Sequence, residues 1–182
     1  MFKIKFKVFS NIKTALFFVF VLFTFLSFSQ TDIFEVWRSG NVEAITKLYK
    51  IDKNIINKTN ENGYSPITLA CYNKNIEIVV FLVDKVKNIN GNSNYGTPLM
   101  AATYKGSAEI VEILLDNNAI TDLQDKKGET AAHLAVMFKK LDIIKLLVEA
   151  KADFKIKNNY EKSPIDYAKL YNDENINKLL KL

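Results

Sequence analysis

Hydrophobic residues recur along much of this chain at spacings of three and four, which is the spacing of one face of an α-helix. The clearest case is residues 107–117, whose apolar positions are Ile110, Val111, Leu114 and Leu115. Residues 97–105 lie just upstream and begin with Thr-Pro. A threonine oxygen can accept from a free helix amide, and proline fits the first helical turn. Gly106 separates the two stretches, so the pattern predicts a helical hairpin.

The hairpin pattern returns at a nearly constant interval. The predicted helix starts are Ser65, Thr97, Thr130 and Ser163. The steps run from 65 to 97, from 97 to 130 and from 130 to 163, a period of 32 or 33 residues. The second predicted helix keeps the same register in the neighbouring units, at Ile78, Val79, Leu82 and Val83, and at Ile143, Ile144, Leu147 and Val148. A weaker first unit begins near Thr31, with Ala44, Ile45, Leu48 and Tyr49 on its second helix.

The helix-start segments read SPITLA, TPLMAA, TAAHLA and SPIDYA. They resemble the ankyrin repeat, in which a β-turn precedes a helix opening with T-P-L-H-x-A and a second helix follows. The resemblance covers roughly residues 31–182 and implies an all-α fold, an ankyrin-repeat solenoid of stacked helix-turn-helix units with short β-turn loops. We expect one repeat domain over residues 30–182, with units near 31–59, 60–91, 92–124, 125–157 and 158–182.

Several positions depart from the repeat pattern. The turn glycine between the helices, Gly106 in the third unit, is replaced by Lys74, Lys139 and Asn172 in three others. The loop glycine before the first helix is replaced by Glu161 in the last unit. These changes weaken single turns and leave the fold assignment unchanged. The last unit also carries Asn177 and Lys181 at apolar positions of the pattern, which suits a terminal layer with a polar outer face.

The first 29 residues have a different character. Four lysines and no acidic residue lie in residues 1–13, and residues 15–28 are an almost unbroken apolar run. This order predicts a secretory signal peptide over residues 1–29, with cleavage after Ser29 and Gln30 as the mature start. The alternative is an uncleaved membrane anchor, although a spanning helix needs ~20 apolar residues. The chain is therefore expected to cross the inner membrane to the periplasm or the exterior, or else to remain anchored by this segment.

Removal of this leader changes the charge of the chain. The full sequence has 25 Lys+Arg against 20 Asp+Glu and a net charge of +5. Without the four leader lysines the balance is 21 against 20. Nucleic-acid binding needs a concentrated positive surface, so no nucleic-acid partner is expected.

The sequence holds one cysteine and one histidine, which removes most catalytic and metal-binding arrangements. Cys71 lies in the first helix of the second unit and is predicted to be a small buried residue, the alternative being a thiol that pairs with a partner. His133 lies at the T-P-L-H position, and the resemblance implies that it hydrogen-bonds near the loop backbone. We expect no catalytic residue, metal, cofactor or small-molecule substrate.

Stacked repeats form an extended concave face, which the resemblance assigns to the loop tips and first helices. Tyrosine combines a large apolar ring with a polar end and is enriched at interfaces. The candidate partner-binding residues are Tyr64, Tyr72, Tyr95, Tyr104, Lys105, Met137, Phe138, Tyr160 and Tyr171. The alternative is that some of these rings pack between adjacent units and meet no partner.

The expected function is therefore that of an exported protein–protein interaction module, monomeric when free, which binds a partner protein through the concave face. A rigid preformed surface limits the ordering cost of such binding. A narrower version is an inhibitor or immunity-type protein for an exported enzyme or toxin. A membrane-tethered structural scaffold, with membrane contact only through an uncleaved leader, is the other alternative, and enzymatic activity is not expected.

Overall fold

The computed structural model describes residues 33–93 and 96–182, so the predicted signal peptide lies outside the described residues. Within these ranges the chain forms helices and no β-strand, with one isolated bridge between Ser93 and Gly96. The helices pair in chain order as α2 (Ile33–Ser39) with α3 (Val42–Ile51), α4 (Pro66–Tyr72) with α5 (Ile76–Leu82), α6 (Pro98–Lys105) with α7 (Ala108–Asp116), α8 (Ala131–Met137) with α9 (Leu141–Glu149), and α10 (Pro164–Tyr171) with α11 (Glu174–Leu180). A short 3-10 helix, η1 (Lys53–Asn57), follows α3.

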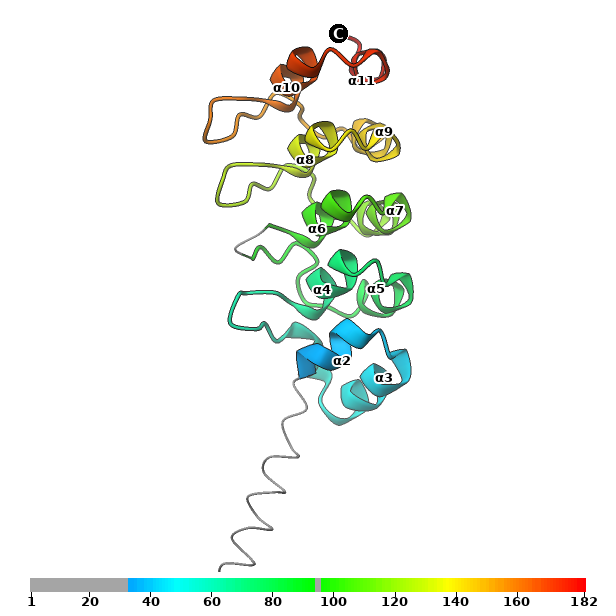
Figure 1. Ribbon diagram of the computed structural model, residues 1–182. Helices are drawn as coiled ribbons and strands as arrows, with labels where there is room; N and C mark the ends of the chain where they lie inside the picture. The colour runs from blue at the N-terminus through cyan, green and yellow to red at the C-terminus, as the bar shows by residue number, and fades with distance from the viewer. Residues whose placement is uncertain (1–32, 94–95) are drawn as a thin grey trace, which may run out of the picture.

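The helix pairs are stacked in layers along one axis (Figure 1). Each first helix contacts the first helix of the next layer, as α4 does with α6 and α6 with α8, and the second helices form a parallel row from α5 to α11. The loops that precede α4, α6, α8 and α10 project to the same side (Figure 1). The predicted all-α solenoid of stacked helix-turn-helix units is thus confirmed.

The first helices α4, α6, α8 and α10 begin at the predicted residues, whereas Thr31, the predicted start of the first unit, lies outside the described residues. Each start has a hydroxyl side chain that accepts a hydrogen bond from the backbone amide three residues later, and these N-caps are Ser65, Thr97, Thr130 and Ser163. Proline occupies the first turn of α4, α6 and α10. Such a cap is worth about 1 kcal/mol. Local sequence therefore fixes where every layer after the first begins.

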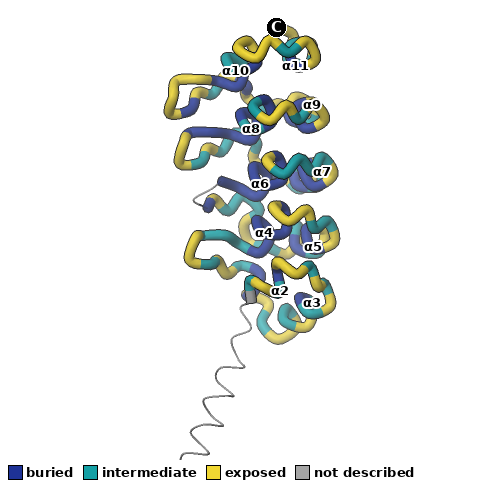
Figure 2. Tube along the Cα trace, viewed as in Figure 1, coloured by how far each residue is buried: buried dark blue, intermediate teal, exposed yellow. Residues whose placement is uncertain are grey.

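The buried hydrophobic residues form one cluster through the stack, and Figure 2 shows buried stretches on both helices of the inner layers. The first three predicted second-helix positions are fully or almost fully buried in each inner layer, at Ile78, Val79 and Leu82, at Ile110, Val111 and Leu114, and at Ile143, Ile144 and Leu147. The fourth position is less buried, and Val148 is 39% exposed. This position lies at the edge of the apolar stripe, where contact with the neighbouring layer is weaker.

The two end layers are less well buried because each has a neighbour on only one side among the described residues. Of the predicted positions on α3, only Ile45 is fully buried. At the other end Lys181 is exposed as expected for an outer face. Asn177 is not: it is partly buried, and its Oδ1 has no hydrogen-bond partner within the described residues.

The inter-helix turns keep one backbone conformation whether or not glycine is present. Gly106 has a φ of 69° in the left-handed region, and Lys74, Lys139 and Asn172 have φ values of 57°, 51° and 46°. The left-handed conformation costs a residue with a side chain about 1–2 kcal/mol. The packing of the helices on both sides of the turn offsets this cost, so the substitutions leave the layers intact.

The single 32-residue step has a local cause at the end of α5. In the next layer the Ala119 amide reaches back five residues to the Leu114 carbonyl, past Asn118 in the left-handed conformation with a φ of 64°. After α5 the Val86 amide bonds to the Leu82 carbonyl, only four residues back. The second layer lacks the left-handed residue, so the chain is one residue shorter there without a change in the stacking.

Candidate functional site

A groove of about 630 Å³ lies between the first helices and the loops. Its walls come from α4, α6 and α8 on one side and from residues 125–129 on the other. We call it the concave groove, and it is lined by Tyr64, Thr68, Tyr72, Met100, Ala101, Tyr104, Asp125, Lys126, Lys127, Glu129, Leu134, Met137 and Phe138. Five of the nine candidate residues from the sequence meet in this one groove.

Three aromatic rings form a row along the groove, one from each of three successive layers. The centroids of Tyr72 and Tyr104 lie 6.2 Å apart with ring planes 9° from parallel. Tyr104 and Phe138 meet edge to face, 5.2 Å between centroids and 88° between planes. The residues are 46%, 47% and 44% exposed, in chain order. Each ring therefore contacts a ring of an adjacent layer and also presents a large surface to solvent.

The remaining candidates are more scattered. Lys105 places its Nζ 4.6 Å from the centroid of the Tyr72 ring, at the end of the aromatic row. Tyr171 stacks on Tyr167 at 6.2 Å, and neither it nor the exposed Tyr160 lines the concave groove. Tyr95 lies outside the described residues.

An acidic pair that the sequence reasoning missed also lines the concave groove. The Asp125 carboxylate accepts hydrogen bonds from the Lys127 amide at 2.8 Å and the Glu129 amide at 2.9 Å, which fixes the loop. Glu129 is only 7% exposed, its carboxylate forms no ion pair with a described residue, and its oxygens are not among the fully buried polar atoms that lack a hydrogen-bond partner there. Burial first, and the nearby Asp125 charge second, raise the pKa of Glu129, while Lys127 opposes this shift. Glu129 occupies the position of Tyr64 in the loop, so aligning the loops could have singled it out.

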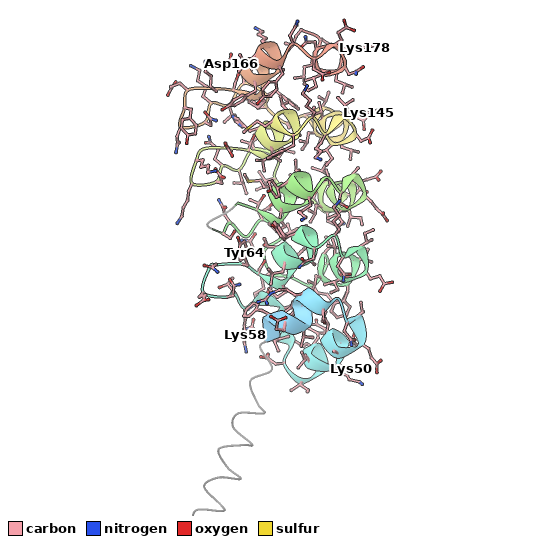
Figure 3. The ribbon with its side chains drawn as sticks, viewed as in Figure 1. Lys50, Lys58, Tyr64, Lys145, Asp166 and Lys178 are labelled. Carbon is pink, nitrogen blue, oxygen red and sulfur yellow. The ribbon has the colours of Figure 1, made fainter. Side chains whose placement is uncertain are left out.

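The loop side of the concave groove is held by hydrogen bonds between layers. Asn92 donates to the Gln124 carbonyl at 2.9 Å, Gln124 donates to the Lys157 carbonyl at 3.0 Å, and Asn159 donates to the Lys126 carbonyl at 2.9 Å. Figure 3 shows Tyr64 where its loop meets the helices, whereas Lys50 and Lys145 project from the second-helix side. The groove is therefore a preformed surface on the loop side of the stack.

Comparison with known proteins agrees with this architecture. The sequence profile described as "Ankyrin repeats (3 copies)" matches residues 33–125 and 117–181. The chain belongs to the ankyrin repeat family. Ankyrin repeats are generally protein–protein interaction modules, and their fold is a non-catalytic one.

Among individual relatives, an ankyrin repeat protein of fowlpox virus (strain NVSL) is 35% identical over 150 residues, which cover 82% of this chain and 27% of the viral protein. Alpha-latrotoxin-Lh1a of Latrodectus hasselti is 38% identical over 71 residues, or 38% of this chain and 5% of the toxin. The aligned part is thus less than a third of the length of either relative.

The lone histidine of this ankyrin repeat protein joins two layers. His133 is fully buried, and its Nδ1 accepts from the Thr130 amide at 3.0 Å. The proton must then be on Nε2, which donates to the Lys162 carbonyl at 3.0 Å. Burial, the largest effect, lowers the pKa of His133. The expected hydrogen bonding to loop backbone is confirmed, and the histidine is neutral and structural.

The lone cysteine is inaccessible. Cys71 is fully buried in α4, and burial raises the pKa of its thiol. The prediction of a small buried residue is confirmed. Pairing of this thiol with a partner would require the layer to open. No cluster of three or more His, Cys, Asp or Glu able to hold a metal ion occurs within the described part of the chain.

Proposed function

We propose that this ankyrin repeat protein is exported and binds a partner protein through the concave groove. The observation that carries the proposal is the row of Tyr72, Tyr104 and Phe138, whose half-exposed rings form one surface across three layers. Burial of apolar area contributes about 25 cal/mol per Å², so covering these rings would favour association. Packing between the layers uses only part of each ring.

The rigidity of the site supports the same conclusion. The rings stand at the ends of packed helices, and the opposite wall is hydrogen-bonded from layer to layer. A partner would therefore meet a surface that needs little reordering, which reduces the entropic cost of binding. Aromatic residues that are both rigid and exposed are the usual energetic centres of protein interfaces.

The test compares a variant altered in the groove with a control variant altered at exposed apolar residues elsewhere on the stack. In the first, Tyr72, Tyr104 and Phe138 become alanine; in the second, the exposed Val80 and Ile120, which lie outside the groove, become serine. Each protein is immobilised and exposed to the exported fraction of its native source, after circular dichroism and thermal unfolding have verified the fold. The proposal requires capture of the same partner by the wild type and the Val80/Ile120 variant, and its loss in the groove variant.

The identity of the captured protein refines the function. A single dominant exported enzyme or toxin would indicate an inhibitor or immunity-type role, whereas several partners would indicate a general interaction module. Equal capture by the groove variant and the wild type would refute the groove as the binding surface.

Export is supported by the basic and apolar character of residues 1–29. Among the helices that the structure describes, none is long and apolar enough to cross a membrane. The mass of the mature protein from its native source tests the proposal. A chain that starts at Gln30 agrees with cleavage and export, whereas a retained leader favours the membrane-tethered scaffold.

A further inference from the structure

We infer that the concave groove receives an arginine side chain of the partner, with the Glu129 carboxylate as its counter-ion and the tyrosine rings as its stacking surface. The inference deepens the proposed function and rests on it. Three observations in the described structure support it: a buried glutamate whose carboxylate forms no ion pair, a row of rings that already attracts a cation, and a lining whose acidic residue is buried while its lysines are exposed.

Glu129 supplies the first observation. It is 7% exposed, lines the groove and has no ion-pair partner for its carboxylate within the described residues. Partial burial of this carboxylate and repulsion from its neighbour Asp125 both disfavour its charged form, and the attraction of Lys127 offsets them only in part. The chain therefore carries a negative charge in a position that disfavours it. A partner cation at this point would remove the penalty and make the binding surface complementary.

The aromatic row supplies the second observation. The Nζ of Lys105 lies 4.6 Å from the centroid of Tyr72, so one ring of the row already contacts a cation of the same chain. An arginine guanidinium is planar: it stacks on such rings and donates two parallel hydrogen bonds to a carboxylate. A lysine ammonium is a hydrated point charge that cannot do both. A groove that combines rings with a carboxylate therefore fits arginine better than lysine.

The lysines of the lining supply the third observation. Lys126 and Lys127 also line the groove, but both are exposed, in contrast to Glu129. The buried glutamate of the lining is thus acidic, and its exposed lysines are basic. This arrangement matches a partner segment that presents an arginine beside an acidic residue, and it disfavours a uniformly basic segment because the lysines would repel it.

The inference is tested with a pair of small probes that differ in charge. N-acetyl-arginine amide and N-acetyl-citrulline amide have nearly the same shape, but only arginine carries the guanidinium charge. Each is titrated into the isotopically labelled protein, and the backbone amide shifts are followed by NMR. We expect the arginine probe to shift amides of Ala101, Tyr104 and Glu129 in a saturable way, and the citrulline probe to leave them unchanged.

The matched variants are Glu129→Gln and Glu149→Gln, because Glu149 is exposed on α9 outside the groove and its change removes the same charge. Glu129→Gln should weaken arginine binding about 10-fold, the effect of losing one charge-assisted hydrogen-bonded contact, and Glu149→Gln should not. Equal shifts with citrulline, equal affinities of the two variants, or no saturable shift at all would overturn the inference.

The two levels of the proposal fail separately. If the Tyr72/Tyr104/Phe138 variant loses its protein partner while Glu129→Gln binds that partner as tightly as the wild type, the groove binds a protein but the arginine inference is wrong. If the aromatic variant still captures the partner, the proposed function itself fails.

Discussion

Two loop glycines offer a sharp test of how the layers are held together, because they share a conformation but differ in surroundings. Gly63 and Gly128 have φ values of 80° and 74°, so alanine is strained at both. A Cβ at Gly63 would come no closer than 3.6 Å to Ser93 Cα, an ordinary contact. A Cβ at Gly128 would lie 2.7 Å from Asn159 Oδ1 and 2.9 Å from Asn159 N.

The expected losses of stability follow from these distances. At Gly63 alanine adds only the left-handed strain, reduced by its smaller unfolded-state entropy, a net cost of about 1 kcal/mol. Gly128→Ala has the same strain plus an overpacking cost of about 1–3 kcal/mol. It also displaces the Asn159 amide, which donates to the Lys127 carbonyl at 2.9 Å. Gly128→Ala should therefore cost about 2–4 kcal/mol in total.

The assay is urea unfolding of both variants, together with hydrogen exchange of the amides in residues 158–162. Stacked layers can unfold one by one, so exchange locates the damage that a single midpoint would average. Gly128→Ala should accelerate exchange in this loop and Gly63→Ala should not. Comparable losses for the two variants would show that contact between the loops contributes nothing, and would refute the reasoning.

Three further predictions concern burial and charge. Leu114→Ala should lower the free energy of unfolding by about 2–5 kcal/mol, because Leu114 is fully buried. Val148→Ala, at a position that is 39% exposed, should lower it by less than about 1 kcal/mol in the same urea assay. Equal losses would contradict the layered core. Because the folded pKa of His133 lies below 6.5, the unfolded state binds more protons as the pH falls below 6.5, so the free energy of unfolding should fall there. His133→Gln should lack this component, and a parallel pH profile would exclude the histidine as its source. Because the folded pKa of Glu129 is raised above 4.5, its charge opposes folding at neutral pH. Glu129→Gln should therefore unfold at a higher urea concentration than the wild type at neutral pH, and this gain in stability should disappear below pH 4.5. An unchanged urea midpoint at neutral pH would contradict the prediction.

The stacked fold can be predicted from the amino-acid sequence, because the signals that encode it are local and repeated. The hydroxyl caps at Ser65, Thr97, Thr130 and Ser163 are read from neighbouring residues. The spacing of apolar residues then predicts which side of each second helix is buried. Because the same signals recur in every unit, the fold can be predicted even where one unit differs from the repeat pattern. Lys74 is such a difference, and the two helices that it joins hold it in the left-handed conformation.

Which candidate residues share a site depends on contacts between layers that form when the chain folds. Tyr72 and Tyr104 stand seven residues after their helix starts and Phe138 stands eight after its own, yet their rings form one row because stacking aligns side chains in space. Tyr171 matches Phe138 in the repeat but lies outside the groove lining. The burial of Glu129 also depends on neighbouring layers. Local sequence encodes caps and helix faces, whereas desolvation and ring contacts arise between residues about 30 positions apart, and no local pattern records them.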